Sequence, residues 1–217
     1  DLAHELRTPV SNLLTQTQVT LSRARSADEY RDILASNAEE FERLSRTIAD
    51  MLFLAKAENN QLIPHPEPLE LADEVAELLE FYGVLAEEKE IRLSVVGHGT
   101  VSGDRLMLRR AISNLLSNAL RYTPVGGTVT VRIETQGDEA VKLTVENTGP
   151  CIAAEHLPRL FDRFYRTDSA RQRTTEGSGL GLAITRSILI AHGGDVSVSS
   201  AEGITRFTLS LPVGGQL

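Results

Sequence analysis

The sequence predicts an α+β protein of two domains, a helical hairpin followed by a sheet covered by helices on one face. Three observations predict this class. Residues 1–59 space their apolar side chains as helices do, residues 60–68 carry prolines at 64, 66 and 68, and the remainder mixes helical and strand-like segments. We therefore expect a helical domain at 1–59, an extended linker at 60–68 and a mixed domain at 69–217.

The helical region contains one break, at Ser26-Ala27-Asp28, which reads as a turn or helix cap. In the second helix, residues at alternating steps of three and four form a seam. They are Leu34, Asn37, Phe41, Leu44, Ile48, Met51 and Ala55. Two helices alone bury too little, so we expect a second copy to pair along this seam and form a four-helix bundle in a homodimer. Asn37 is interpreted as a register-setting or partly solvated position.

The mixed domain contains both helical and strand-like segments. Helices are expected at about 72–89, 104–121 and 179–192, and strands at 91–96, 128–135, 140–146, 194–200 and 204–211. Short glycine turns at 126–127 and 137–138 join neighbouring strands. The sheet should therefore be largely antiparallel, with the helices on one face.

Composition excludes several classes of protein. With 22 basic and 30 acidic residues the net charge is −8, which argues against a nucleic-acid binder that neutralises phosphates. A single cysteine cannot form an internal disulfide. No apolar run approaches the ~20 residues that span a bilayer. The chain opens without a methionine or a helix cap, so we expect it to be a segment of a longer protein.

The first candidate site is the segment His4-Glu5-Leu6-Arg7-Thr8-Pro9. On a helix Thr8 shares a face with His4, and Glu5 is adjacent. A solvent-facing imidazole beside a carboxylate can act as a nucleophile toward phosphorus, and Thr8 can orient a water for the reverse hydrolysis. Pro9 would bend the helix just after the site. An ordinary surface histidine explains the segment equally well.

The second candidate lies on the helix expected at 104–121. Asn114 and Asn118 are four residues apart and share a face with apolar neighbours. Half-buried carboxamides need partners, and a hydrated Mg²⁺ bridging to phosphates is one. Arg121, three residues on, would meet phosphate charge. The alternative is that both asparagines satisfy backbone groups.

Two glycine-containing turns complete the set. Asn147-Thr148-Gly149 follows a strand, and the Asn147 amide can read a purine edge, although a plain turn is the alternative. Gly177-Ser178-Gly179-Leu180-Gly181 leads into a helix, whose first N–H groups favour phosphate. No Gly-Lys-Ser/Thr follows, so this is no Walker A loop, and a Rossmann turn fits poorly because no βαβ unit surrounds it.

A polar stretch at 167–176 separates the two turns. We expect it to be a lid over a ligand, anchored at its base by Phe161 and Phe164. The alternative is an exposed loop beside core aromatics.

All these segments, in this order, resemble the catalytic core of the sensor histidine kinases, from residue 1 to about 212. The matching boxes are the H box at 4–9, the N box at 114–118, the G1 box at 147–152, the F box at 161–164 and the G2 box at 177–181. The resemblance implies a dimeric phosphotransfer domain and an α/β-sandwich ATP domain of the type shared with Hsp90 and gyrase B.

The resemblance also implies roles for single residues, with ATP and Mg²⁺ as cofactors. His4 would be the phosphoacceptor, Glu5 its acid/base partner and Thr8 the phosphatase residue. Asn118 would be the Mg²⁺ ligand, with Asn114 beside it. The remaining nucleotide contacts implied are Arg121 and Arg166 at the phosphates, Tyr122 packed near the nucleotide, Asn147 and Gly149 at the adenine, and Gly177, Gly179, Leu180 and Gly181 at the phosphate end.

By the same resemblance, the chain would autophosphorylate His4, pass the phosphoryl group to a response-regulator aspartate and dephosphorylate that regulator. It would be the cytoplasmic portion of a bacterial inner-membrane protein, tied to the membrane through other segments. Asn147 stands where the family usually has aspartate, which resembles the heavy-metal (copper/silver) sensor branch and predicts weaker adenine binding. Cys151 replaces a glycine of the G1 box, and neither it nor the histidines show metal-ligand spacing.

Two other functions remain open from the sequence. An ATP-gated clamp or ATPase would use the same nucleotide domain without a phosphohistidine, although the hairpin with His4 argues against it. A degenerate kinase that serves as a dimerisation scaffold is the other, because the G1 box departs from the family pattern.

Overall fold

The structure, a computed structural model, describes residues 2–137, 139–167 and 178–213, and only the backbone of residues 2–5. The chain divides into two units, Asp1–Phe53 and Leu54–Leu217. The border falls inside a helix, so the domain boundaries expected at 59/60 and 68/69 stay a prediction. Within the described part of the chain, no helix is long and apolar enough to cross a bilayer.

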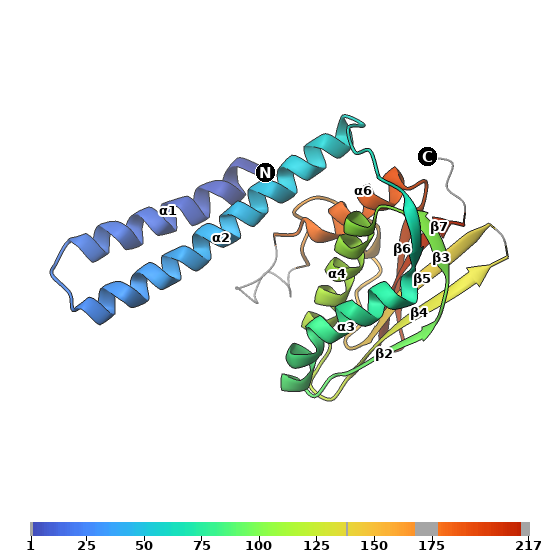
Figure 1. The fold of residues 1–217 in the computed structure, drawn as a ribbon. Coiled ribbons are helices and arrows are strands. Elements are labelled where there is room, and N and C mark those ends of the chain that lie inside the picture. The colour runs from blue at the N-terminus through green and yellow to red at the C-terminus, as the bar shows by residue number, and fades with distance from the viewer. Residues whose placement is uncertain (1, 138, 168–177, 214–217) are drawn as a thin grey trace. The chain divides into compact units, whose positions relative to one another are not determined.

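The first unit contains a helical hairpin of α1 (Leu2–Leu21) and α2 (Ala27–Glu58), whose last residues belong to the second unit (Figure 1). The predicted break is confirmed, and it carries a capping box. The Glu29 N–H donates to Ser26 Oγ at 3.2 Å, while the Ser26 N–H donates to Glu29 Oε2 at 2.9 Å. Helix α1 continues through Pro9.

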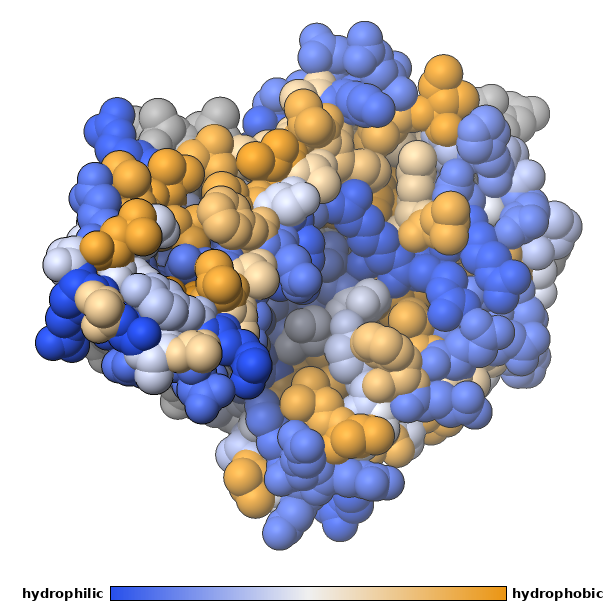
Figure 2. All heavy atoms as spheres, turned by 60° about the vertical axis from the view of Figure 1, so that its left-hand side comes forward, coloured by the Kyte–Doolittle hydropathy of each residue, from blue (hydrophilic) through white to orange (hydrophobic). Residues whose placement is uncertain are grey.

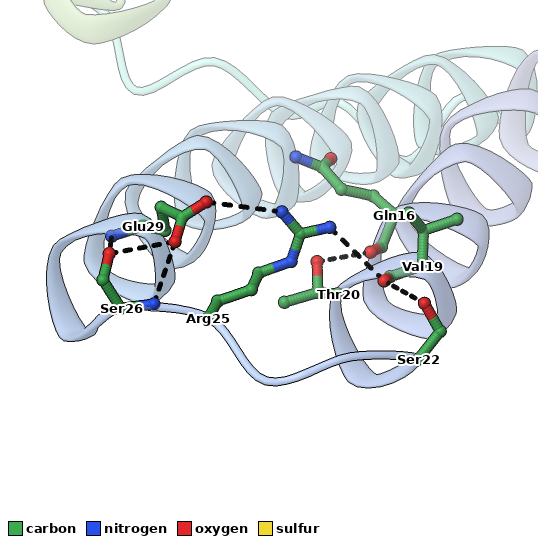
Figure 3. A network of polar contacts seen from close by, with 7 residues as sticks. All are labelled: Gln16, Val19, Thr20, Ser22, Arg25, Ser26 and Glu29. Carbon is green, nitrogen blue, oxygen red and sulfur yellow. Dashed lines mark hydrogen bonds and ion pairs between the residues drawn. The ribbon is translucent and has the colours of Figure 1, made fainter.

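Arg25 joins the two helices at this turn (Figure 3). Its guanidinium donates to the Val19 carbonyl at 3.4 Å and lies 3.8 Å from the Glu29 carboxylate. The arginine therefore satisfies a carbonyl at the end of α1, where cations are favoured, and contacts the first turn of α2.

The hairpin leaves large apolar side chains in solvent when a single chain is considered. Leu13 is buried, but others on both helices are more than two-fifths exposed. They include Val10, Leu14, Leu34, Phe41, Ile48 and Leu52. Asn37 is buried rather than partly solvated, and its Oδ1 has no hydrogen-bond partner within the described residues. Figure 2 shows apolar residues gathered among polar ones on the face that it presents.

The second unit is built on a five-stranded sheet of order β2-β4-β5-β7-β6. Its strands are β2 (Arg92–Gly97), β4 (Thr128–Gln136), β5 (Ala140–Thr148), β6 (Asp195–Ala201) and β7 (Ile204–Pro212). Helices α3 (Leu71–Glu88), α4 (Arg105–Tyr122) and α6 (Gly181–Ala191) cover one face, and a short 3-10 helix, η1, spans Leu157–Arg159 (Figure 1). The predicted α+β class is confirmed. The sheet is largely antiparallel as expected, with one parallel pair, β2 and β4.

The core lies between the sheet and the three helices. Alternate residues of β4, β5 and β7 point toward the helices and are buried, as a half-buried antiparallel sheet requires. The helices contribute fully buried side chains to the core, among them Ile112, Leu115, Leu116, Ile184, Ile188 and Leu189.

Two short strands were not predicted. β1 (Glu67–Glu70) and β3 (Thr100–Gly103) pair antiparallel in a sheet of their own. Glu70 fixes the turn before β3, because its carboxylate accepts from the Gly99 N–H and the Thr100 hydroxyl, both at 2.9 Å. The linker is therefore extended, as expected, but its last residues belong to a strand.

Helix α4 is fixed against α3 by a buried carboxylate. Glu74 on α3 is 6% exposed, and Arg105 and Arg109 of α4 each approach it to 2.9 Å. A buried charge is tolerated only when it is paired and hydrogen-bonded, so these contacts hold the two helices in one register.

Asp104 anchors the start of α4. Its carboxylate accepts from the Met107 N–H at 3.0 Å as an N-cap and from the His65 N–H of the linker at 3.1 Å. Its own N–H donates to Nε2 of the buried His192 at 2.9 Å, so the proton of that imidazole lies on Nδ1, which donates to the Ile188 carbonyl at 2.8 Å. One residue thereby joins the linker, α4 and the end of α6.

Asp104→Ala should lower the free energy of unfolding at pH 7 by about 1–3 kcal/mol, because it removes a cap and a second buried acceptor. Burial alone would raise the pKa of Asp104, but the N–H groups of Met107 and His65 hold it below its usual value. A depressed carboxyl pKa stabilises the fold above the unfolded pKa of about 4, and this contribution is lost as pH falls through the folded pKa.

The measurement is urea unfolding of the wild-type chain and the variant from pH 7 down to about pH 3.5. The difference in the free energy of unfolding between the wild-type chain and the alanine variant should become smaller below about pH 4. Asp104→Asn, which keeps an acceptor oxygen but no titration, serves as control. A wild-type–alanine difference that stays constant over this range would contradict the assignment.

Candidate functional site

The two asparagines of α4 have different surroundings. The Asn114 amide donates from Nδ2 to the Gly181 carbonyl at 3.0 Å, and the Thr185 hydroxyl donates to the same carbonyl at 3.0 Å. Asn114 therefore joins α4 to the first residue of α6. Asn118 lies one turn further along α4 and is half-buried.

The G2 turn lies directly on the F box. Gly179 has φ +69°, and a Cβ there would come within 2.9 Å of the Phe164 Cα. The Phe164 N–H donates to the Gly179 carbonyl at 3.0 Å. Glycine is therefore required at position 179 for two reasons, its left-handed backbone and the close approach of the Phe164 backbone. Leu180, the next residue, is fully buried.

Gly177 of the G2 box and residues 168–176 of the expected lid lie outside the described residues. At the base of that stretch, Phe161 packs edge-to-face on Phe207 of β7, with ring centroids 6.3 Å apart. This contact fixes Phe161 against the sheet, and its role as an anchor of the expected lid stays a prediction. Arg166 is half-buried just before the stretch.

The G1 turn begins at the end of β5. Asn147 is 6% exposed between Val129 of β4 and Thr205 of β7, and its Nδ2 donates to the Thr148 carbonyl at 3.3 Å. Gly149 follows, where a Cβ would lie 2.9 Å from the Tyr122 carbonyl at the end of α4. The structure thus brings the N-box helix and the G1 turn together.

The resulting arrangement suits a nucleotide. A buried amide at Asn147 lies near the ends of two central strands, Tyr122 is 38% exposed at the end of α4, and Arg121 precedes it. Helix α6 begins at Gly181, and a helix N-terminus attracts phosphate through its free N–H groups and dipole. A helix N-terminus for phosphate and a polar amide for the base, both in contact with α4, are groups that a nucleoside phosphate can use.

The predicted nucleophile lies on the other unit. His4 and Glu5 belong to α1 by their backbone, and their side chains lie outside the description. Thr8 is exposed one turn further along the same helix. The roles assigned to these three residues therefore stay predictions.

Among the described residues, no group of three or more His, Cys, Asp or Glu side chains is placed to hold a metal ion. Mg²⁺ bound to a nucleotide needs less from the protein, because phosphates and waters fill most of its six positions. One carboxamide oxygen from Asn118 fits that requirement.

Sequence reasoning missed the residues that hold the G1 turn in place. The Ile152 N–H donates to Ser200 Oγ and the Gly149 N–H donates to the Gly203 carbonyl, each at 2.9 Å. Glu202-Gly203 is a recognisable hairpin turn, but no spacing in the sequence relates it to residues some 50 positions earlier.

Known proteins resemble the chain over its whole length. Sensor histidine kinase CusS of Escherichia coli (strain K12) is 57% identical over 213 residues, 98% of this chain and 44% of CusS. Probable sensor kinase SilS of Salmonella typhimurium is 49% identical over 219 residues, again 98% and 44%. The chain thus spans less than half the length of these curated relatives. The structure of Acinetobacter baumannii histidine kinase AdeS superposes with a TM-score of 0.80 at 26% identity, covering 97% of this chain and 98% of that one.

Two family models match separate parts of the chain. Residues 1–60 match the His Kinase A (phospho-acceptor) domain, which includes His4. Residues 103–215 match the histidine kinase-, DNA gyrase B- and HSP90-like ATPase domain, which includes α4, the G1 turn and α6. The predicted resemblance is confirmed, down to the branch of CusS and SilS, and the chain belongs to the sensor histidine kinase family.

Proposed function

We propose that this chain is the catalytic core of a sensor histidine kinase that uses Mg²⁺-ATP to phosphorylate His4 and then passes the phosphoryl group to an aspartate of a response-regulator receiver domain. One observation carries the proposal. A phospho-acceptor domain and an ATPase domain occur in one chain, and in the second α4 contacts both the N-terminus of α6, through Asn114, and the G1 turn, through Tyr122.

In this mechanism a ring nitrogen of His4 attacks the γ-phosphorus as the bond to the β–γ bridging oxygen breaks and ADP leaves. Glu5 accepts or positions the imidazole proton. The N-terminus of α6 and the arginines Arg121 and Arg166 oppose the phosphate charge, and Asn147 binds the base. Mg²⁺, held through Asn118, would neutralise charge on the phosphates. Apart from the His4 nucleophile itself, the protein contributes position and electrostatics to the transfer.

Incubation with γ-³²P-ATP and Mg²⁺ tests this function. Labelled protein that is stable to alkali and labile to acid supports a phosphohistidine. Steady ATP turnover without covalent label would instead support the ATP-gated clamp. Absence of Mg²⁺-ATP binding by calorimetry would support the scaffold.

We further propose that the whole protein is a bacterial inner-membrane sensor of the heavy-metal branch, and that this core is its cytoplasmic portion. The support is the likeness to CusS and SilS together with asparagine at position 147. The sensing region would lie in the part of the protein that this chain does not span.

Pairing of two helical hairpins should depend on the exposed apolar side chains of α1 and α2, such as Phe41. Phe41→Asp should shift the chain from dimer to monomer at micromolar concentration, because each protomer loses about 1.5–3 kcal/mol of apolar burial and gains an unpaired charge. Sedimentation equilibrium measures it. Leu106→Asp, at a position of α4 that is 80% exposed, is the matched control and should leave the dimer intact. Unchanged association of the Phe41 variant would rule out this face.

Thr8→Ala should retain autophosphorylation but lengthen the lifetime of phosphorylated regulator, because no hydroxyl then orients the attacking water. The effect should be on the order of 10-fold or more, because a misplacement of about 1 Å in a reacting group can cost ~10²-fold. Thr8→Ser, which restores the hydroxyl, should recover the activity. An unchanged regulator-phosphate lifetime would remove Thr8 from the mechanism.

A further inference from the structure

The G1 turn is held from outside the nucleotide site by the hairpin between β6 and β7. Three hydrogen bonds cross from residues 149–152 to residues 200–203. The Gly149 N–H donates to the Gly203 carbonyl at 2.9 Å, the Gly203 N–H donates to Cys151 Sγ at 3.2 Å, and the Ile152 N–H donates to Ser200 Oγ at 2.9 Å. We call this set of contacts the hairpin clamp.

The hairpin is shaped to make these contacts. Glu202 and Gly203 both have positive φ, +53° and +75°, in a two-residue turn between the paired residues Ala201 and Ile204. Such a turn leaves the N–H and carbonyl of its second residue outside the strand ladder. In this chain both groups of Gly203 bond to the G1 turn, one to backbone and one to a side chain.

The side chain at 151 supplies a contact that glycine cannot. Cys151 stands where the family pattern has glycine, and its sulfur accepts from the Gly203 N–H, which a glycine at this position has no side chain to do. The thiol sulfur is a weak acceptor, and the residue is exposed, so this bond positions the turn more than it stabilises the fold. Ser200 acts similarly, since its hydroxyl accepts from Ile152 and shares a hydrogen bond of 2.8 Å with Thr205.

The hairpin clamp is connected to Asn147, the residue proposed to bind the base, through Thr205. Thr205 lies directly opposite Asn147 in the β5–β7 ladder, and both are buried. On its other side the turn is limited by the Tyr122 carbonyl, 2.9 Å from where a Gly149 Cβ would be. The turn is therefore fixed between the end of α4 and the hairpin, with Asn147 at its start.

We propose that the β6–β7 hairpin is a positioning element of the nucleotide site, in which Ser200, Gly203 and Cys151 set the conformation of residues 149–152 and thereby the affinity for the nucleotide base. This inference rests on the proposed nucleotide site. Asn147 lacks the negative charge of the usual aspartate, which lowers the affinity for the base. A turn that is already fixed loses less conformational freedom on binding, and this raises the affinity again.

The test compares Cys151→Ala, Ser200→Ala and Cys151→Ser in the full chain, with Ser197→Ala, at an exposed position of β6, as matched control. Calorimetry gives the dissociation constant for ADP, and autophosphorylation gives KM and kcat for ATP. Loss of one such hydrogen bond should raise both the dissociation constant and KM about 3- to 10-fold with kcat little changed. Cys151→Ser keeps an acceptor and should bind like the wild type.

Amide hydrogen exchange provides a readout without nucleotide. The Ile152 amide should exchange faster in Ser200→Ala than in the control, by more than the change in global stability of the variant accounts for. Wild-type ADP affinity in both alanine variants overturns the positioning role alone. A wild-type chain that binds neither ADP nor ATP overturns the nucleotide site and this inference together.

Discussion

Replacing His4 by glutamine should abolish acid-labile ³²P labelling of the chain, a loss on the order of 10³-fold or more, because removing a covalent nucleophile leaves no group to form the N–P bond. Glutamine approximates the size of the imidazole but has no nucleophilic ring nitrogen. ADP affinity should stay within about twofold of the wild type, because α4, the G1 turn and α6, where we propose the nucleotide site, all belong to the other unit.

A matched control is available among the other histidines. His98 is exposed between β2 and β3, so His98→Gln changes the same side chain without touching either predicted site. It should label as the wild type does. Labelling of the His4 variant at the wild-type level would place the phosphoacceptor elsewhere and refute the central assignment, whereas loss of ADP binding in that variant would show that the two units do not act independently.

Glu5 refines the same experiment. If its carboxylate handles the imidazole proton, Glu5→Gln should slow labelling without changing the stability of the product or the affinity for ADP. Labelling should be lower in the His4 variant than in the Glu5 variant. An acid/base group changes the rate of labelling, whereas the nucleophile forms the N–P bond itself.

Most elements of the fold were predictable because their signals are local. The capping box at Ser26 and Glu29 ends the hairpin loop, and strict alternation marks β4, β5 and β7. The short strands β1 and β3 were missed since four residues are too few to show alternation, and prolines obscure the first. The parallel pairing of β2 with β4 was missed because it joins strands separated by a helix.

The site was predictable as a set of segments but not as a set of contacts. Spacing placed Asn114 and Asn118 on one face of a helix, and glycines marked the turns. Spacing did not reveal that Asp104 ties that helix to the linker, nor that Ser200 and Gly203 hold the G1 turn. These contacts join residues 39 to about 54 positions apart, so only the tertiary fold brings them together.

The same limit applies to the division of labour between the two asparagines. From sequence, both were candidate partners of a hydrated metal. In the structure, Asn114 donates to the Gly181 carbonyl, so its amide belongs to the joint between α4 and α6. The carboxamide oxygen of Asn118 is then the donor that suits Mg²⁺.

Asn118→Ala should therefore remove the effect of Mg²⁺ on nucleotide binding. The wild type should bind ADP more tightly with Mg²⁺ than with EDTA, and the variant should show one affinity under both conditions. Autophosphorylation should fall on the order of 10²-fold or more, because one preorganised interaction with developing phosphate charge is lost. Ser117→Ala, on the same turn of α4, is the matched control and should change neither measurement.

Asn114→Ala should behave differently although the substitution is the same. Breaking the bond to Gly181 should weaken ADP binding with and without Mg²⁺ alike, and it should speed amide exchange at the start of α6. If Asn114→Ala instead removed the Mg²⁺ dependence and Asn118→Ala preserved it, the two roles would be exchanged. That result would mean that the hydrogen bond to Gly181 gives way when nucleotide binds, and that the metal is held one turn earlier on α4.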